Sequence, residues 1–184
     1  FDHPSTLATS IELATPTLSN EQIGAHRGAS GSYPENTRAA FDAAASVGAG
    51  WIETDVQCLA DGELVIFHDV HLGRTASGSA KVTLLSWPDM AGLDIGGWKG
   101  EAFASQGQLG CKDLIAWPGE RSDRPGFVWE VKWDDEPAGE DAAERAGKQR
   151  VAESGGHRCV VTEFRRKGVY EQRTQWAKER TKRK

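Results

Sequence analysis

The sequence predicts an α/β fold in which strands alternate with helices. Several short apolar runs have the length of strands, and a stretch rich in small residues lies between the first two of them. Each apolar run is nearly continuous rather than alternating, which is typical of strands that are buried on both faces of a parallel sheet. An open doubly wound sheet and a βα-barrel both fit this pattern.

The predicted elements begin at about residue 23. Ile23–His26 is a short strand, and a turn that contains glycine and serine leads from it to a helix. Asn36 is expected to cap the N-terminus of this helix, because its side chain can accept a hydrogen bond from the first turn. Two further strands, Trp51–Val56 and Leu64–His68, flank a tight turn at Asp61-Gly62.

The second half of the chain contains fewer clear elements. Residues 69–108 are irregular, with one short helix predicted at Ser86–Gly92. Another short helix is predicted at Lys112–Trp117. Phe127–Lys132 is a strand, and Cys159–Thr162 is predicted as the last strand of the sheet.

The 184 residues suit a single domain with one sizeable core. We expect residues 1–20 to be a loose lead-in without regular structure and residues 21–164 to form the folded βα domain. Residues 165–184 are rich in lysine and arginine, and we expect them to form a basic helical tail.

Composition argues against several classes of function. The net charge of −5 argues against nucleic acid as the main partner. No apolar run approaches the roughly 20 residues that a membrane-spanning helix needs. The odd number of cysteines, three, is typical of a reducing compartment, and we expect a cytoplasmic location. Because the sequence begins with Phe1 rather than Met, a removed signal peptide remains an alternative.

Two predicted strands each carry a pair of ionisable residues. Glu53 and Asp55 lie two positions apart, so both side chains project to the same face, and Glu130 and Lys132 repeat this spacing. Neighbouring buried carboxylates are tolerated when a cation lies between them, and Mg²⁺ or Ca²⁺ prefers such oxygen ligands. Glu130 could complete a metal site, with Lys132 placed to bind an anion. The alternatives are a solvated acidic face for the first pair and a surface ion pair for the second.

Two histidines, His26 and His68, each end a predicted strand. Either could be a polar residue at the edge of the sheet. Two histidines beside Arg27 and a group of carboxylates also suit a general acid and a general base with a guanidinium for phosphate. Functional residues of parallel α/β folds gather at the C-terminal ends of strands, where these residues are expected to lie.

The chain resembles the glycerophosphodiester phosphodiesterase family in a series of motifs that follow one another in the family's order. These motifs are His26–Ser30, Pro34–Thr37, Gly48-Ala49, Ile52–Val56, Asp61–Val65, Phe67–Asp69, Leu72–Thr75, Leu93–Gly96 and Trp129–Lys132. The resemblance implies a TIM-type (β/α) barrel. It also implies hydrolysis of a small-molecule glycerophosphodiester to glycerol 3-phosphate and an alcohol.

The resemblance also implies a role for each site residue. Glu53, Asp55 and Glu130 would hold a divalent cation, Mg²⁺ or Ca²⁺, His26 and His68 would be the acid/base pair, and Arg27 and Lys132 would bind phosphate. In the mechanism proposed for the family, a glycerol hydroxyl attacks phosphorus and water then opens the resulting cyclic phosphate.

The length of the chain bears on the fold, and two alternative functions stay open. A complete barrel of eight units typically needs about 250 residues, so we expect the barrel to be incomplete at its C-terminus, with open strand edges that could support self-association. The chain could then be a catalytically silent or fragmentary phosphodiester-binding domain that needs a partner chain. A related phospholipase D that acts on lysolipids would use a metal and the same two histidines.

Overall fold

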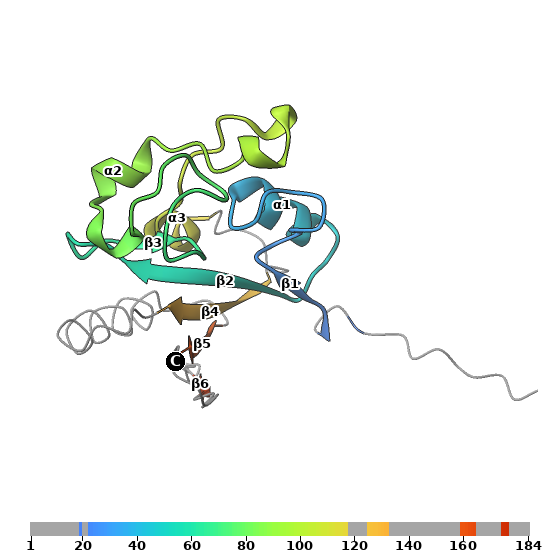
Figure 1. Cartoon of the computed structure of the whole chain (residues 1–184). Helices are drawn as coiled ribbons and strands as arrows, with labels where there is room; N and C mark the ends of the chain where they lie inside the picture. The colour runs from blue at the N-terminus through green and yellow to red at the C-terminus, as the bar shows by residue number, and fades with distance from the viewer. Residues whose placement is uncertain (1–18, 20–21, 118–124, 133–158, 165–173, 177–184) are drawn as a thin grey trace, which may run out of the picture.

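The structure is a computed structural model, and it describes residue 19 and residues 22–117, 125–132, 159–164 and 174–176. The described strands form one twisted sheet with the order β1-β2-β4-β5-β6, and β3 pairs with β2 outside this path (Figure 1). The strands are β1 (Gly24–His26), β2 (Trp51–Cys58), β3 (Leu64–Ile66), β4 (Gly126–Lys132), β5 (Cys159–Phe164) and β6 (Thr174–Trp176). Strands β1, β2, β4 and β5 are mutually parallel, as predicted, and β6 is antiparallel to β5.

Strand β3 departs from the predicted parallel pairing, because it runs antiparallel to β2 with Val56 opposite Ile66. The predicted tight turn is present: Gly62 has a φ of +82°, and its N–H donates to the carbonyl of Leu59 at 3.0 Å. The strand also ends two residues before His68, so this histidine lies beyond the strand rather than at its end. Nevertheless, the hairpin returns the chain to the middle of β2, where the N–H of Phe67 donates to the carbonyl of Asp55 at 3.1 Å.

The first helix, α1 (Arg38–Ser46), begins one residue later than predicted, because Thr37 rather than Asn36 is its N-cap. The hydroxyl of Thr37 accepts a hydrogen bond from the N–H of Ala40 at 3.2 Å. The preceding turn approaches this helix closely at Gly28, where an added Cβ would lie 2.7 Å from Ala40 atoms. Gly28 also has a φ of +81°, so both space and backbone conformation require glycine at this position.

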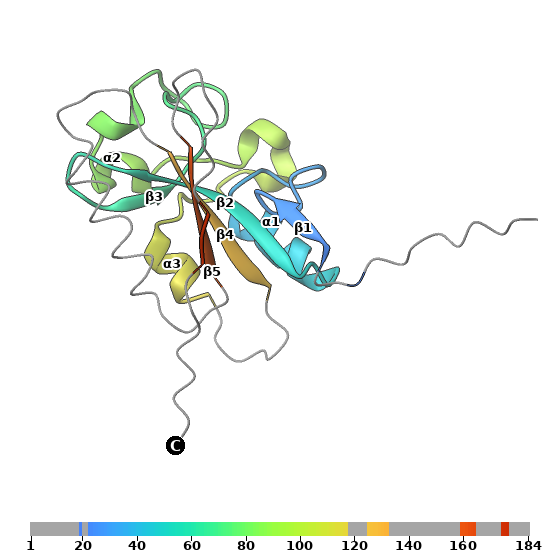
Figure 2. The ribbon, with the colours of Figure 1, turned by 90° about the horizontal axis from the view of Figure 1, so that it is seen from below.

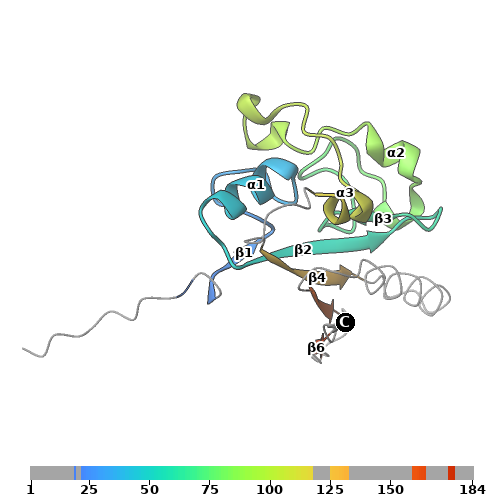
Figure 3. The ribbon, with the colours of Figure 1, turned by 180° about the vertical axis from the view of Figure 1, so that it is seen from behind.

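Two short helices, α2 (Trp87–Ala91) and α3 (Cys111–Ile115), coincide with the two segments predicted to be helical, although α3 begins one residue before the predicted start at Lys112. The described part of the chain also contains short 3₁₀ helices at Val82–Leu84, Gly97–Lys99 and Glu101–Phe103. A small apolar cluster that includes Met90 of α2 holds the segment after β3 together. The views from two opposite sides show α1 and α3 on the same side of strands β2 and β4 (Figures 1 and 3).

The two faces of the sheet therefore differ in chemistry. Ile52 of β2 and Trp129 of β4 pack in one core with Phe41 of α1 and Leu114 of α3. Successive side chains of a strand point to opposite faces. Glu53 and Asp55 of β2 therefore point away from these helices. Seen from below, β4 and β5 cross in front of β2 (Figure 2). The acidic residues thus lie on the face of the sheet opposite α1 and α3.

Several predicted segments fall wholly or partly outside the described residues. The lead-in is described only at Ser19, and the acidic segment at 134–147 is not described. The predicted last strand is present as β5. Within the predicted helical tail, 165–184, only Thr174–Trp176 is described, and these residues form β6. Among the described residues, no helix has both the length and the apolar character needed to cross a bilayer.

Candidate active site

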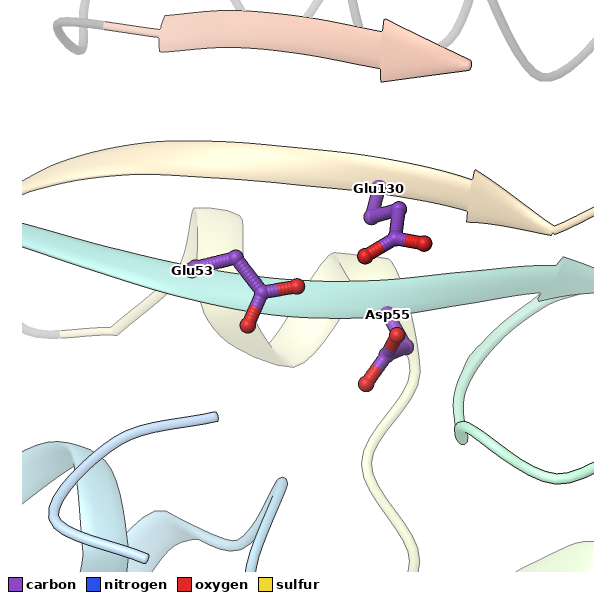
Figure 4. Close-up of side chains that lie close together, drawn as sticks. All are labelled: Glu53, Asp55 and Glu130. Carbon is purple, nitrogen blue, oxygen red and sulfur yellow. The ribbon is translucent and has the colours of Figure 1, made fainter. Parts of the chain in front are cut away.

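The site is built around three carboxylates on two neighbouring strands. Glu53 and Asp55 project from the same face of β2, and Glu130 of β4 is the register partner of Asp55. Oxygen atoms from the three residues all lie within 4.8 Å of one another. Figure 4 shows the three side chains close together, with Glu53 and Asp55 on β2 and Glu130 on the neighbouring β4. The expectation that two separate strands bring their acidic residues together is met.

Two cationic side chains adjoin this cluster. Lys132 Nζ lies 3.1 Å from Asp55 Oδ1 and also contacts Glu130 Oε1. Arg27 Nε lies 3.1 Å from Asp55 Oδ2, and the backbone N–H of Arg27 donates to Glu53 Oε2 at 3.0 Å. Asp55 is fully buried, and these two cationic side chains offset part of the cost of burying a carboxylate.

Arg27 and Asn36 hold an unusual backbone conformation. Their φ angles are +56° and +57°, in the left-handed region that side chains other than glycine rarely adopt. Non-glycine residues in this region cost about 1–3 kcal/mol each and cluster at functional sites. The conformation of Asn36 also directs its amide into the core, where it donates to Asp55 Oδ2 at 2.9 Å and accepts from Thr54 Oγ1 at 3.0 Å.

The electrostatics of the cluster favour a bound cation. Burial, and then the neighbouring charge of Asp55, raise the pKa of Glu53 to about 7. Among the described residues, Glu53 Oε1 is also buried and accepts no hydrogen bond. A carboxylate oxygen that is buried, repelled by its neighbours and without a donor is suited to ligate a hard divalent cation. The residues present therefore fit a metal of the Mg²⁺ or Ca²⁺ class.

His26 lies at the edge of this cluster. On β1 it is the register partner of Glu53, and its Nε2 is 3.8 Å from Glu53 Oε2. Its side chain is 66% exposed, so the imidazole can reach solvent and a ligand above the carboxylates.

His68 contacts a different carboxylate. Its Nδ1 lies 2.6 Å from Asp69 Oδ1, and the side chain is partly exposed. Gln57 fixes this segment of backbone by donating its amide to the carbonyls of Phe67 and Asp69, at 2.8 and 2.9 Å. His68 is thus held beside the middle of β2, although the strand itself ends earlier than predicted.

Four further polar residues belong to the site's surroundings but were not predicted as site residues: Glu35, Asn36, Asp69 and Arg74. Asn36 was interpreted only as a helix cap. The sequence offered one usable signal, because Asp69 directly follows a histidine that was already a candidate. The pairing of Glu35 with Arg74 spans 39 residues and leaves no periodic pattern.

Comparisons with known proteins agree on one family. The model of the glycerophosphoryl diester phosphodiesterase family matches residues 26–168, more than half of the chain. A glycerophosphodiester phosphodiesterase from Caldanaerobacter subterraneus is 45% identical over 82 residues, which cover 45% of this chain and 34% of the relative.

Two solved structures are also similar. A phosphodiesterase from Oleispira antarctica, in complex with the product sn-glycerol-3-phosphate, has a TM-score of 0.70 and 28% identity, covering 78% of this chain and 57% of that one. A glycerophosphodiester phosphodiesterase from Agrobacterium tumefaciens has a TM-score of 0.59 and 34% identity, covering 78% of this chain and 58% of that one.

These similarities confirm the predicted (β/α) barrel type of fold, of which the described strands form one part. The chain spans about a third of the length of the curated relatives that it matches. Because the family model covers most of the chain, including every predicted site residue, the family itself is shown. The chain belongs to the glycerophosphoryl diester phosphodiesterase family.

Proposed function

We propose that this chain hydrolyses glycerophosphodiesters to glycerol 3-phosphate and an alcohol in a metal-dependent reaction. The observation that carries the proposal is the convergence of three carboxylates within 4.8 Å, beside a histidine–arginine pair. In the proposal Glu53, Asp55 and Glu130 hold a divalent cation. When bound, this cation stabilises negative charge that develops on the phosphoryl oxygens.

The balance of charge supports a phosphodiester as the ligand. Three ionised carboxylates carry three negative charges, and Arg27 and Lys132 offset two of them. Adding a divalent cation leaves a single positive charge, which matches the single negative charge of a phosphodiester. Among the described residues, Arg27 and Lys132 each contact a carboxylate that would ligate the metal, so we propose them as the phosphate-binding residues.

The two histidines provide the proton transfers. In the first step, one imidazole removes the proton of a glycerol hydroxyl, whose oxygen bonds to phosphorus. The bond from phosphorus to the leaving alcohol breaks, and the other imidazole protonates that alcohol. In the second step, the histidine roles are reversed: one imidazole removes a proton from water, whose oxygen bonds to phosphorus. The P–O bond formed in the first step breaks, the other imidazole protonates the released glycerol oxygen, and glycerol 3-phosphate forms. General acid–base catalysis of this kind contributes about 10²–10⁴ to the rate.

The proposal is tested by incubating the chain with glycerophosphocholine and Mg²⁺ or Ca²⁺ and measuring glycerol 3-phosphate. We expect His68→Ala to lower the rate by about 10²–10⁴. His71→Ala is the matched control, because His71 is an exposed histidine of the same segment. Metal-dependent release that His68→Ala leaves unchanged would contradict the role of His68. Choline release from a lysophospholipid but not from glycerophosphocholine would assign the phospholipase D reaction instead.

A second candidate function is phosphodiester binding without turnover. Within the described part of the chain, β1 has a neighbouring strand on one side only, so His26 lies on an open edge of the sheet. Such an edge can pair with another chain, and completing the site could require that pairing. Metal binding without product release, together with a dimeric mass from light scattering after gel filtration, would favour this function. A monomer that releases product would exclude it.

A further inference from the structure

Arg74 lies in the segment after β3, and its guanidinium joins two carboxylates. It donates to Glu35 from Nη1 to Oε2 at 2.9 Å and from Nη2 to Oε1 at 2.7 Å. It donates to Asp69 from Nε to Oδ2 at 2.7 Å and from Nη2 to Oδ1 at 3.0 Å. The planar guanidinium is suited to such paired contacts, which a lysine cannot reproduce. The guanidinium carbon also lies 5.9 Å from the centre of the Trp98 ring.

Each of the two carboxylates leads to a residue of the proposed site. Asp69 lies 2.6 Å from Nδ1 of His68. Glu35 accepts a hydrogen bond from Arg27 Nη1 at 2.9 Å, and Arg27 in turn lies beside Asp55. Arg74 is therefore the central member of a continuous chain of contacts from His68 to the buried carboxylate of β2.

The two carboxylates are charged under ordinary conditions, as this arrangement requires. Burial alone would raise the pKa of Glu35, but hydrogen bonds from Arg74 and the charge of Arg27 outweigh burial and lower it. Burial would likewise raise the pKa of Asp69, yet hydrogen bonds from Arg74 and His68 lower it. An isolated surface ion pair typically contributes about 0–1 kcal/mol, whereas Arg74 holds two partly buried carboxylates at once.

We propose that Arg74 is a positioning residue that acts through Asp69 on the His68 imidazole. The inference rests on the proposed function, because it assigns Arg74 to the acid–base step of that reaction. Arg74 fixes the plane of the Asp69 carboxylate, and Asp69 then accepts a hydrogen bond from the Nδ1–H of His68. This contact leaves Nε2 of His68 as the nitrogen that exchanges protons with substrate. Without Arg74 the carboxylate is free to rotate, and the imidazole loses its fixed orientation.

A purely structural role is the alternative, in which Arg74 only ties its own segment to the turn that carries Glu35. The two roles differ in what Asp69 does. A structural tie would stabilise the fold whether or not Asp69 is charged. If Arg74 acts on His68 only through Asp69, changing Arg74 has no further effect on catalysis once Asp69 is replaced. The effects of changing Arg74 and Asp69 are then not additive.

The experiment compares Arg74→Gln, Arg74→Lys, Asp69→Asn and the double variant of Arg74→Gln with Asp69→Asn. Arg38→Gln is the matched control, because the Arg38 side chain is 43% exposed against 44% for Arg74 and also pairs with a carboxylate and an indole ring. The first readout is independent of activity. Nitrogen-edited NMR of the His68 ring reports which nitrogen is protonated and how fast the Nδ1 proton exchanges with water.

In the wild-type protein we expect His68 to carry its proton on Nδ1. We expect Asp69→Asn to abolish this preference and Arg74→Gln to speed the exchange of that proton by about tenfold or more. Arg38→Gln should leave both unchanged. An unchanged His68 ring in folded Arg74→Gln protein would overturn the proposal, whether or not the chain is active. This arm therefore separates failure of the positioning role from failure of the proposed function.

The second readout is the rate of glycerophosphocholine hydrolysis. We expect Arg74→Gln to lower kcat by about 10–100-fold with little change in KM, and Arg74→Lys to restore only part of the loss. In the Asp69→Asn background, the same change at Arg74 should cost less than about threefold. Equal losses from Arg74→Gln in both backgrounds, or full rescue by lysine, would instead assign Arg74 the structural role.

Discussion

Adding a divalent cation is expected to stabilise the protein in a manner that depends on pH. This dependence on pH comes from Glu53, because its pKa is raised to about 7 by burial and by the charge of Asp55. A metal binds the ionised carboxylate, so below this pKa it must displace a proton. In metal-free protein, the stabilising contribution of the raised pKa is present below the ordinary value of 4.5 and is lost as the pH rises through about 7. Metal-free protein is therefore expected to lose stability over the same range in which the metal gains affinity.

The size of the effect follows from proton linkage. If one proton is displaced, lowering the pH from about 8 to about 5 weakens metal binding about a hundredfold. A metal concentration of about 100 times the Kd at the higher pH stabilises the fold by about 2.7 kcal/mol. The same concentration at the lower pH stabilises it by only about 0.4 kcal/mol. For a chain of this length these values correspond to Tm shifts of about 5–11 °C and about 1–2 °C.

The assay is thermal unfolding with and without Mg²⁺ or Ca²⁺ at the two pH values. Glu53→Gln should bind the metal more weakly and lose this dependence on pH, since its side chain cannot ionise. Glu63→Gln is the matched control, because Glu63 pairs with Lys112 away from the site. A metal-induced Tm shift of the same size at both pH values would refute the assignment of Glu53 as a ligand that exchanges a proton for the cation.

Three further predictions concern the elements that support the site. Gly28→Ala should lower the free energy of unfolding by roughly 1–3 kcal/mol, because its Cβ would lie 2.7 Å from Ala40 atoms at a φ of +81°. Gly24→Ala, where nothing lies within 4 Å, should change it little, and urea unfolding measures both. Asn36→Ala removes two buried hydrogen bonds, so it should cost about 2–3 kcal/mol in the same assay; a loss below that of the Gly24 control would contradict its bridging role. Lys132→Met should weaken binding of sn-glycerol 3-phosphate about 10–100-fold by calorimetry, and unchanged affinity would remove Lys132 from the phosphate site.

The carboxylates were predictable because strand periodicity alone places them. Positions two apart on an apolar strand share a face. The spacing therefore predicted that Glu53 and Asp55 lie on one face of their strand, and that Glu130 and Lys132 lie on one face of theirs. The register that brings Asp55 opposite Glu130 was not predictable in this way. It depends on pairing between strands separated by the whole segment after β3, and no local pattern specifies such pairing.

The direction of β3 was wrong in the prediction for a different reason. A continuous apolar run such as Leu64–His68 shows that a strand is buried but does not show which way it runs. The turn at Asp61-Gly62 was the better guide, since a connection this short can join only antiparallel neighbours. Giving the turn precedence over the apolar pattern would have predicted the hairpin that returns His68 to the level of Asp55.

The cap of α1 and the ion pairs around Arg74 show the limits of local rules. Asn36 and Thr37 are both good capping residues. Thr37 is the cap because the side-chain amide of Asn36 is hydrogen-bonded to Asp55 instead. Arg74 meets Glu35 across 39 residues of sequence, where only the fold brings the two groups together. Polar contacts between residues far apart in the sequence orient the side chains of a site, but the spacing of residues does not predict them.

The most direct test of the account is a crystal structure of the chain with Mn²⁺ and sn-glycerol 3-phosphate. Anomalous scattering locates the metal without reference to the protein atoms. We expect one strong peak about 2.0–2.6 Å from oxygens of Glu53, Asp55 and Glu130, with the phosphate beside Arg27 and Lys132. An anomalous peak elsewhere, or a phosphate bound away from these cationic side chains, would contradict the claim that the three carboxylates form the metal centre of a phosphodiesterase.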